Sequence, residues 1–319
     1  MPQTAAEKPQ ILLSHEMLMP LQPLLEGAYI VHRLWDYPDR MAFLEGPGQS
    51  IRAIVHAGEM ALSRDMLAEM PRLGLIACVS VGYDGVDVPW CKAHGIAVTH
   101  STGLNAADVA DHAVGLVLAA WRGIVEGDQR LRGGHWSHAE RMAPRPGLRG
   151  RKAGVVGLGH IGEAVAARLK AFDMKVAWWA PRPKETDYPR ADSLMALARD
   201  SDVLIVCARP DDSNRHLINK PVIEAVGAQG LIVNVARGSL IDEDALIQAL
   251  RAGTLGMAAL DVFEQEPTPA ARWADVPRTV LTPHTAGATL DSLPAMVSLT
   301  LENLRRYFHG EPLATPVAA

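Results

Sequence analysis

Hydrophobic residues in the first third of this chain occur in short continuous runs, separated by segments with helical spacing. Five of these runs are expected to form strands, at residues 11–15, 28–35, 51–57, 74–81 and 96–100. The segments between them at 19–27, 63–70 and 88–95 are expected to be helices. Continuous rather than alternating hydrophobicity indicates strands that are covered on both faces, as in a parallel sheet. The pattern therefore predicts one α/β unit.

The same alternation begins again after a helix and a polar stretch. Apolar residues recur with helical spacing through residues 105–123, and a Gly- and Pro-rich stretch follows at 130–151. Six further strands are expected at 152–159, 174–180, 202–208, 230–236, 256–262 and 278–284, with helices such as 163–172 and 243–253 between them. This predicts a second, doubly wound parallel sheet. The last segment, 292–310, is amphipathic and has no strand after it.

Length and charge support two domains and exclude some partners. A chain of 319 residues is too long for one small core. Its net charge is -5, and its 31 Lys and Arg residues are scattered along the sequence. Nucleic acids and anionic membranes are bound through clustered positive charge, so neither partner is expected.

Cysteine spacing gives no sign of a metal site. Cys78, Cys91 and Cys207 are far apart and form no CxxC pair, so we expect no disulfide framework, no zinc site and no metal.

The first ten residues are polar, and no apolar run is long enough to span a bilayer. We therefore expect a cytoplasmic protein.

A glycine-rich segment lies between the first strand and first helix of the second unit. Gly157, Gly159 and Gly162 have GxGxxG spacing in this strand-to-helix context, which gives the motif its meaning. The first glycine permits a tight turn, the second lets the backbone approach a pyrophosphate, and the third lets helix and strand pack closely. The helix N-terminus offers amide donors to the phosphates. The segment predicts dinucleotide binding.

The end of the next strand indicates which dinucleotide is preferred. A carboxylate about 20 residues after the glycines commonly binds the ribose of NAD, but Ala180 occupies this position. Arg182 is close enough to bond to a 2′-phosphate, so we expect NADP(H) to be preferred, with NAD(H) possible. The alternative is that Arg182 is a solvated loop residue and that Lys184 or neither residue matters.

Polar residues follow three apolar strands of the second unit. They are Arg237, the pair Asp261 and Glu266, and His284. The carboxyl ends of strands in a doubly wound sheet line the ligand crevice, so these residues could face one site. An arginine can bind a carboxylate with two hydrogen bonds, and a histidine can transfer a proton.

Five ordered motifs resemble the D-isomer-specific 2-hydroxyacid dehydrogenase family. They are VSVGYDGVD (79–87), GLGHIG (157–162), VARGSLIDEDAL (235–246), LDVFEQEP (260–267) and TPHTAGAT (282–289). The resemblance covers nearly the whole chain and is strongest to hydroxypyruvate and glyoxylate reductases. It implies reduction of a small 2-ketoacid to the D-2-hydroxyacid.

The resemblance also assigns roles to residues. It implies that Arg237, Glu266 and His284 are catalytic, and that Asp261 bonds to the nicotinamide amide. It places the substrate carboxylate at the amides of Val81 and Gly82, with Ala57 and Gly58 nearby. In the cofactor loop, His160 and Ile161 join the three glycines.

The family fold implies a Rossmann cofactor domain and a flavodoxin-like substrate domain, with the active site in the cleft. The substrate domain is expected to comprise residues 1–101 and 287–319, and the dinucleotide-binding domain residues 102–286. A homodimer is expected, with the apolar helix around 116–121 in the contact.

Several alternatives stay open at this point. Arg237 could pair with Asp242 at the surface, and Glu264 could replace Glu266 as the functional acid. The side chains of His112 and His160 are taken as structural. A catalytically silent dinucleotide-sensing scaffold shares this fold, and formate dehydrogenases resemble the same family but have glutamine for the acid; Glu266 argues against both. Glyoxylate and hydroxypyruvate are the default substrates, and aryl ketoacids remain open.

Overall fold

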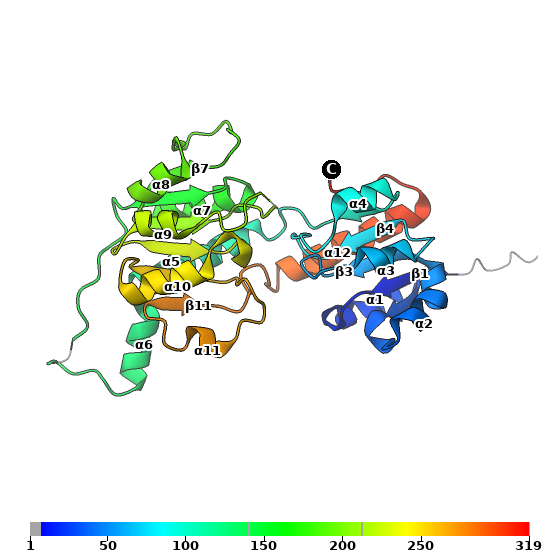
Figure 1. The fold of residues 1–319 in the computed structure, drawn as a ribbon, viewed down its shortest axis with the longest axis horizontal. Helices are drawn as coiled ribbons and strands as arrows, with labels where there is room; N and C mark the ends of the chain where they lie inside the picture. Colours follow the sequence, from blue (N-terminus) through cyan, green and yellow to red (C-terminus); the bar gives the residue numbers. More distant parts are fainter. Residues whose placement is uncertain (1–7, 140, 212, 319) are drawn as a thin grey trace, which may run out of the picture. The chain divides into compact units, whose positions relative to one another are not determined.

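The chain folds into two compact α/β units, seen in a computed structural model that describes residues 8–139, 141–211 and 213–318 (Figure 1). The first unit contains the described residues up to Asn105 and those from Leu290 onward. The second unit is continuous and runs from Ala106 to Thr289. Each unit contains one parallel sheet, which confirms the predicted fold class.

The sheet of the first unit has five parallel strands in the order β2-β1-β3-β4-β5. They are β1 (Gln10–Leu13), β2 (Ile30–Arg33), β3 (Ile51–His56), β4 (Leu75–Cys78) and β5 (Ala97–Thr99). All four residues of β4, and all but Arg52 in β3, are buried, as the continuous apolar runs predict. The chain order reverses between β1 and β3, so the sheet is doubly wound.

Helices cover both faces of this sheet. They are α1 (Gln22–Leu25), α2 (Arg40–Glu45), α3 (Arg64–Ala68), α4 (Val88–Ala93) and α12 (Ser292–His309), with the 3-10 turns η1 (Glu16–Leu21), η2 (Leu34–Asp36) and η3 (Pro47–Ser50). The long C-terminal helix α12 contacts β4, and its Met296 and Leu304 are buried with Ile11 and Leu75. The amphipathic last segment thus packs in the first unit.

The sheet of the second unit has six parallel strands in the order β11-β10-β9-β8-β6-β7. They are β6 (Lys152–Val156), β7 (Lys175–Trp179), β8 (Val203–Val206), β9 (Leu231–Asn234), β10 (Met257–Leu260) and β11 (Thr279–Leu281). The strand order reverses between β6 and β8. Ligands in open α/β sheets bind outside the carboxyl ends of the strands at such a reversal.

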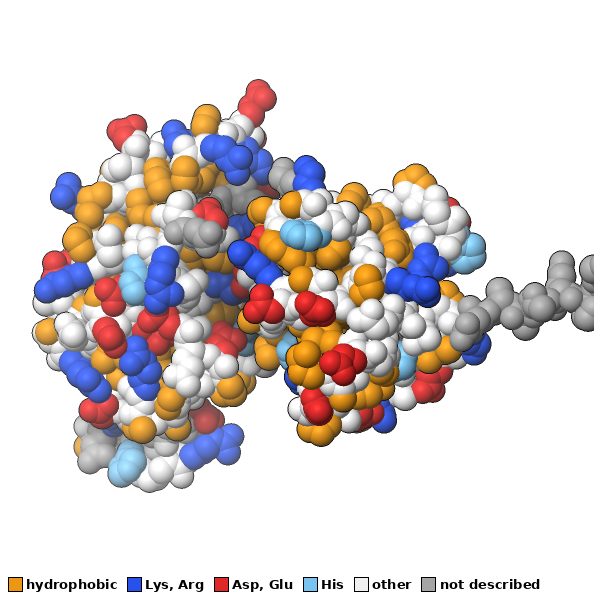
Figure 2. All heavy atoms as spheres, turned by 45° about the vertical axis from the view of Figure 1, so that its right-hand side comes forward, with side chains coloured by type: hydrophobic (Ala, Val, Ile, Leu, Met, Phe, Trp, Pro, Cys, Tyr) orange, Lys and Arg blue, Asp and Glu red, His pale blue; other side chains and the backbone are white. Residues whose placement is uncertain are grey.

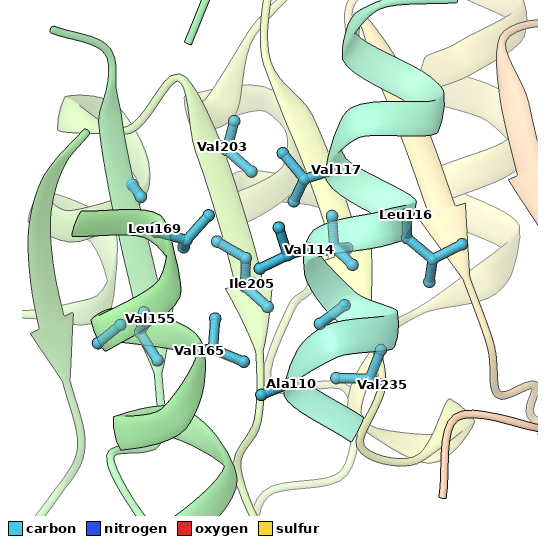
Figure 3. Packing of buried hydrophobic residues seen from close by; sticks show 14 of the residues in the cluster. Ala110, Val114, Leu116, Val117, Val155, Val165, Leu169, Val203, Ile205 and Val235 are labelled. Carbon is cyan, nitrogen blue, oxygen red and sulfur yellow. The ribbon is translucent and has the colours of Figure 1, made fainter. Parts of the chain in front are cut away.

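Apart from α6 (Ile124–Arg132), the helices of the second unit pack in two cores, one on each face of the sheet. They are α5 (Ala106–Trp121), α7 (His160–Ala171), α8 (Leu194–Asp200), α9 (Lys220–Val226), α10 (Glu243–Ala252) and α11 (Ala270–Trp273), with the 3-10 turn η4 (Gly238–Leu240). On one face, α5 packs beside α7. Figure 3 shows Val114 and Val117 of α5 in the same cluster as Val165 of α7 and Ile205 of β8.

Part of the helix predicted at a subunit contact, 116–121, is buried in its own unit. Leu116, Val117 and Trp121 are at most 3% exposed, whereas Leu118 and Ala119 are half-buried, and the contact itself stays a prediction. A buried side chain is not available to a partner subunit. Exposed apolar side chains lie instead on α6 and just after it, at Ile124, Val125, Leu131 and Trp136.

The outer surface carries both signs of charge. Lys and Arg are interspersed with Asp and Glu over the face drawn in Figure 2. Within the described residues, no helix is both long and apolar enough to cross a membrane.

Candidate active site

The cofactor loop has backbone geometry that requires glycine at two of its three motif positions. Gly157 follows β6 with φ +88, and a Cβ there would lie 2.6 Å from the Cα of Ala208. A Cβ on Gly162 would lie 2.1 Å from the carbonyl oxygen of Gly157. The loop, the end of β8 and the first turn of α7 therefore approach too closely for any larger residue.

The second glycine of the motif, Gly159, leaves room for a ligand. Gly159 is the N-cap of the 12-residue helix α7, and it supplies no side-chain cap. A Cβ built on Gly159 would have no atom within 4 Å among the described residues. Amides at the start of α7, at His160 and Ile161, lie at this N-terminus. A helix N-terminus with open space in front of it fits the pyrophosphate of a dinucleotide.

The end of β7 presents a neutral residue followed by an arginine. Ala180 comes directly after the strand, and Arg182 is exposed two residues later. Among the residues that the structure describes, Arg182 has no hydrogen bond or ion pair. Lys184, in contrast, donates to the carbonyl of Leu158 at 3.1 Å and pairs with Glu163 at 2.6 Å. Of the two cations, Arg182 is the one whose donors are unused among the described residues.

Arg237 is held in place by the buried residue that ends β9. Asn234 is 1% exposed, and its side-chain amide donates to the carbonyl of Arg237 at 2.9 Å while its oxygen accepts from the amide of Ala236. The guanidinium of Arg237 donates to the carbonyl of Ala236 at 2.8 Å. Asp242, the alternative partner considered for Arg237, caps α10 by accepting from the amide of Ala245.

A carboxylate and an imidazole are hydrogen-bonded beyond the ends of β10 and β11. Nδ1 of His284 lies 2.6 Å from Oε2 of Glu266, and the amide of Phe263 donates to the other carboxylate oxygen at 2.9 Å. Glu264 binds elsewhere, with Oε1 at 2.6 Å from Nε2 of His216 and 2.8 Å from Arg215. The structure thus brings Glu266, and not Glu264, to His284.

The electrostatics of this pair keep Glu266 ionised. Burial raises the pKa of Glu266, but the hydrogen bonds from His284 and the Phe263 amide, together with the charges of His284 and Arg237, outweigh burial. The pKa of Glu266 therefore lies below its ordinary value. The charge of Arg237 acts on the same carboxylate, so the three predicted catalytic residues lie in one neighbourhood.

Asp261 lies beneath the turn that carries His284. Its side chain is 1% exposed, and its two oxygens accept hydrogen bonds from the amides of Thr285 and Ala286 and from the hydroxyl of Thr282. Through these bonds the carboxylate of Asp261 holds the backbone turn that follows β11. Its contact with a nicotinamide amide stays a prediction.

In the first unit, the four predicted substrate residues lie in two adjoining loops after β3 and β4. The hydroxyl of Ser80 lies 2.7 Å from the carbonyls of both Ala57 and Gly82. Gly58 has φ +77, and a Cβ there would lie 2.1 Å from the oxygen of Gly82. The carbonyl of Val81 accepts from Nδ1 of His100 at 3.0 Å.

The amides of this second loop are open to an acceptor. Within the described parts of the chain, neither Val81 nor Gly82 donates a backbone hydrogen bond, although both of their carbonyls are occupied. Two adjacent amide donors without acceptors make a suitable binding place for a carboxylate.

Comparison with known proteins identifies the family. Residues 114–286 match the family described as D-isomer specific 2-hydroxyacid dehydrogenase, NAD binding domain. The chain is 35% identical over 308 residues to glyoxylate/hydroxypyruvate reductase A of Arabidopsis thaliana, covering 96% of this chain and 98% of that relative. The chain therefore belongs to the D-isomer specific 2-hydroxyacid dehydrogenase family, as the five motifs predicted.

Two solved structures share both units. A 2-hydroxyacid dehydrogenase from Ketogulonicigenium vulgare has a TM-score of 0.90 and 42% identity, covering 98% of this chain and 99% of that chain. An NADPH-dependent glyoxylate/hydroxypyruvate reductase from Sinorhizobium meliloti, solved with NADP and malonate, has a TM-score of 0.90 and 34% identity, covering 98% and 97%. Together with the matched NAD binding domain, these structures support a nicotinamide dinucleotide as the cofactor.

Sequence reasoning missed the residues that support the site. Asn234 and Thr282 carry no recognisable chemistry of their own, and the sequence predicts only a structural role for His112. Their one signal is position: Asn234 is the last residue of β9 and Thr282 the first residue after β11. Asn234 is buried and Thr282 half-buried, and polar side chains at strand ends are where turns in such sheets find hydrogen-bond partners.

Proposed function

We propose that this protein reduces a small 2-ketoacid, of the glyoxylate or hydroxypyruvate type, to the D-2-hydroxyacid, with NADPH preferred over NADH. The hydrogen bond between His284 and Glu266 is the observation that carries the proposal. Reduction of a ketone needs an acid that delivers a proton to the oxygen. His284 can be this acid, because an ionised carboxylate beside it stabilises its protonated form.

In this proposal the guanidinium of Arg237 orients the substrate and polarises its keto oxygen. In the first unit, the amides of Val81 and Gly82 are the proposed donors to a substrate carboxylate. When bound, the reduced dinucleotide supplies the hydride that forms the new C–H bond. His284 gives its proton to the keto oxygen, so the carbonyl becomes a hydroxyl. Glu266 stabilises the imidazolium before transfer, and the neutral ring then takes a new proton from solvent.

The cofactor preference rests on the end of β7. Ala180 puts no negative charge beside a 2′-phosphate, and Arg182 is exposed with its hydrogen-bond donors unused among the described residues. A planar guanidinium suits the bidentate binding of a phosphate. The NADPH-dependent relative from Sinorhizobium meliloti shows that the family includes enzymes with this preference.

The direct test is the initial rate of cofactor oxidation with NADPH and with NADH, on glyoxylate, hydroxypyruvate and phenylpyruvate. Faster turnover of the two small ketoacids, with a lower KM for NADPH than for NADH, supports the proposal. Turnover of phenylpyruvate alone would show that the substrates are aryl ketoacids and not small ones. Cofactor binding without turnover of any of the three would instead favour a silent scaffold.

A homodimer belongs to the same proposal. The exposed apolar side chains of Ile124, Leu131 and Trp136 give α6 and its following loop a surface suited to a second copy of the chain. Light scattering coupled to gel filtration should give twice the chain mass. An Ile124→Glu and Leu131→Glu double variant should shift the protein toward monomer, whereas a wild-type monomer would overturn this part.

A further inference from the structure

The turn that presents His284 wraps around one buried carboxylate. The main-chain amide of His284 donates to the carbonyl of Asp261 at 2.7 Å. The next two amides, of Thr285 and Ala286, donate to Oδ1 and Oδ2 of the same residue at 3.0 and 2.9 Å. His284 has φ +52, in the left-handed region that a residue with a side chain seldom adopts. Such a conformation persists only where the surrounding bonds hold it.

Three side chains complete the shell around Asp261, one of them the hydroxyl of Thr285 at 3.5 Å from Oδ1. The hydroxyl of Thr282 lies 2.5 Å from Oδ1 of Asp261, and Nε2 of His112 lies 3.0 Å from that hydroxyl and 3.4 Å from the carboxylate. His112 belongs to α5, whose Ala113 and Val114 are buried in the core of the unit. The network therefore connects the turn to a helix whose position is set by packing.

The direction of these bonds follows from the groups involved. An ionised carboxylate only accepts, so Thr282 must use its single proton on Asp261. The hydroxyl oxygen can then only accept from His112, which places a proton on Nε2 of that ring. The chain of donors runs from His112 to Thr282 to Asp261, and it ends at the carboxylate that holds the turn.

We propose that Thr282 and His112 are positioning residues, which act through Asp261 to keep His284 oriented toward Glu266. The inference rests on the proposed function, in which His284 delivers the proton. Neither residue touches the reacting atoms in this proposal. Their loss should slow proton delivery while leaving the glycine loop and the amides of Val81 and Gly82 intact.

Matched variants separate positioning from a general loss of structure. Thr282→Val removes the hydroxyl at nearly constant volume, and Thr282→Ser keeps it. His112→Leu removes the Nε2 donor, and His112→Gln offers an amide donor in its place. We expect Thr282→Val to lower kcat about tenfold to a hundredfold, with KM for the cofactor changed less than twofold and a larger solvent deuterium isotope effect. Thr282→Ser should keep most of kcat, and His112→Gln should recover what His112→Leu loses.

A spectroscopic readout tests the inference independently of activity. In protein labelled with 15N-histidine, the Nδ1–H of His284 bonded to Glu266 should give a far-downfield proton signal, assigned by its loss in His284→Asn. This signal should persist in Thr282→Ser and weaken or broaden in Thr282→Val. An unchanged signal in Thr282→Val, or equal loss of kcat in the Ser and Val variants, would overturn the positioning role. A wild-type protein that shows the signal but reduces no ketoacid would overturn only the proposed function.

Discussion

Nδ1 of His284 and Oε2 of Glu266 are 2.6 Å apart, and each residue is held by its own part of the chain. The turn around Asp261 fixes the histidine, whereas the amides of residues 263 and 264 fix the loop of the glutamate. Phe263 donates directly to Glu266, and the amide of Glu264 donates to Oε1 of the buried Glu243 at 2.6 Å. The hydrogen bond between His284 and Glu266 thus joins two loops, each of which is held by its own backbone hydrogen bonds.

Replacing Glu266 should change how the reaction depends on pH. In Glu266→Gln the ring of His284 loses the neighbouring negative charge and holds its proton less strongly. Reduction needs that proton, so the pH above which kcat/KM falls should move down, and its maximum should drop about tenfold to a hundredfold. The measurement is the pH profile of ketoacid reduction.

Glu264→Gln is the matched control for this prediction. Glu264 lies two residues away and carries the same charge, but it bonds to His216 and Arg215. Its profile should follow the wild type. If Glu264→Gln moves the alkaline limb and Glu266→Gln does not, the assignment of the acid pair is wrong.

Alanine substitutions at Gly157 and Gly159 should have different effects on stability and on cofactor affinity. Gly157→Ala forces a Cβ against the backbone of Ala208 at positive φ, so we expect the free energy of unfolding to fall by about 2 kcal/mol or more. Gly159→Ala puts its methyl group into open space, so stability should stay within about 0.5 kcal/mol of wild type. The dinucleotide Kd should nevertheless rise about tenfold, because the methyl group occupies the approach to the helix N-terminus.

Urea unfolding and cofactor titration of both variants check this contrast. Equal stability losses in the two variants would contradict the packing argument. Unchanged cofactor affinity in Gly159→Ala would show that the pyrophosphate does not approach the backbone here.

The sequence points to the candidate site residues more readily than to the residues that hold them in place, such as Thr282 and His112. The reason is physical. Arg237 and His284 follow apolar strands, and strand ends of a doubly wound sheet are where ligands bind. The resemblance favours Glu266 over Glu264, but the residues alone leave both open, because both follow β10 and backbone geometry decides which carboxylate reaches the ring. The hydrogen bonds that hold the His284 turn include the contact between His112 and Thr282. These residues are 170 positions apart, so no local pattern reveals the contact.

The helices for which the sequence analysis gives no bounds also share a cause. The helices α8 and α9 have seven residues each, too few to show a clear helical period. Their N-caps, Ser193 and Asn219, were the available signals, since each accepts from a main-chain amide of the first turn. The helix α6 buries no residue, so its apolar side chains do not mark a core-facing stripe.

Changing the end of β7 should switch the cofactor preference. Arg182→Gln removes the charge available to a 2′-phosphate, so KM for NADPH should rise about tenfold while KM for NADH changes little. Ala180→Asp should lower KM for NADH and raise KM for NADPH further, because a carboxylate accepts from the ribose hydroxyl and repels the phosphate. Arg199→Gln, at the exposed end of α8, is the control for loss of a positive charge. Equal changes for both cofactors in Arg182→Gln would show that Arg182 does not discriminate between them.

His56 should make the protein sensitive to mild acid. Its side chain is fully buried at the end of β3, between the hydroxyl of Ser14 at 2.8 Å and the carbonyl of Met60 at 2.9 Å. Burial lowers the pKa of His56 to about 4; the bond to Met60 opposes this shift, and the neighbouring His15 adds to it. In the unfolded chain the ring regains its ordinary pKa of about 6.5, so the unfolded state binds a proton more readily.

The free energy of unfolding should therefore fall as the pH decreases from 6.5 toward 4, and the contribution of His56 should be exhausted below that. The gap between the two pKa values is equivalent to about 3 kcal/mol of stability at neutral pH. Urea unfolding of wild type between pH 4 and 7 should show this slope, and His56→Gln should flatten it even if its overall stability is lower. A titration of the His56 ring by NMR gives the folded pKa directly, and a value near 6.5 would remove the basis for the slope.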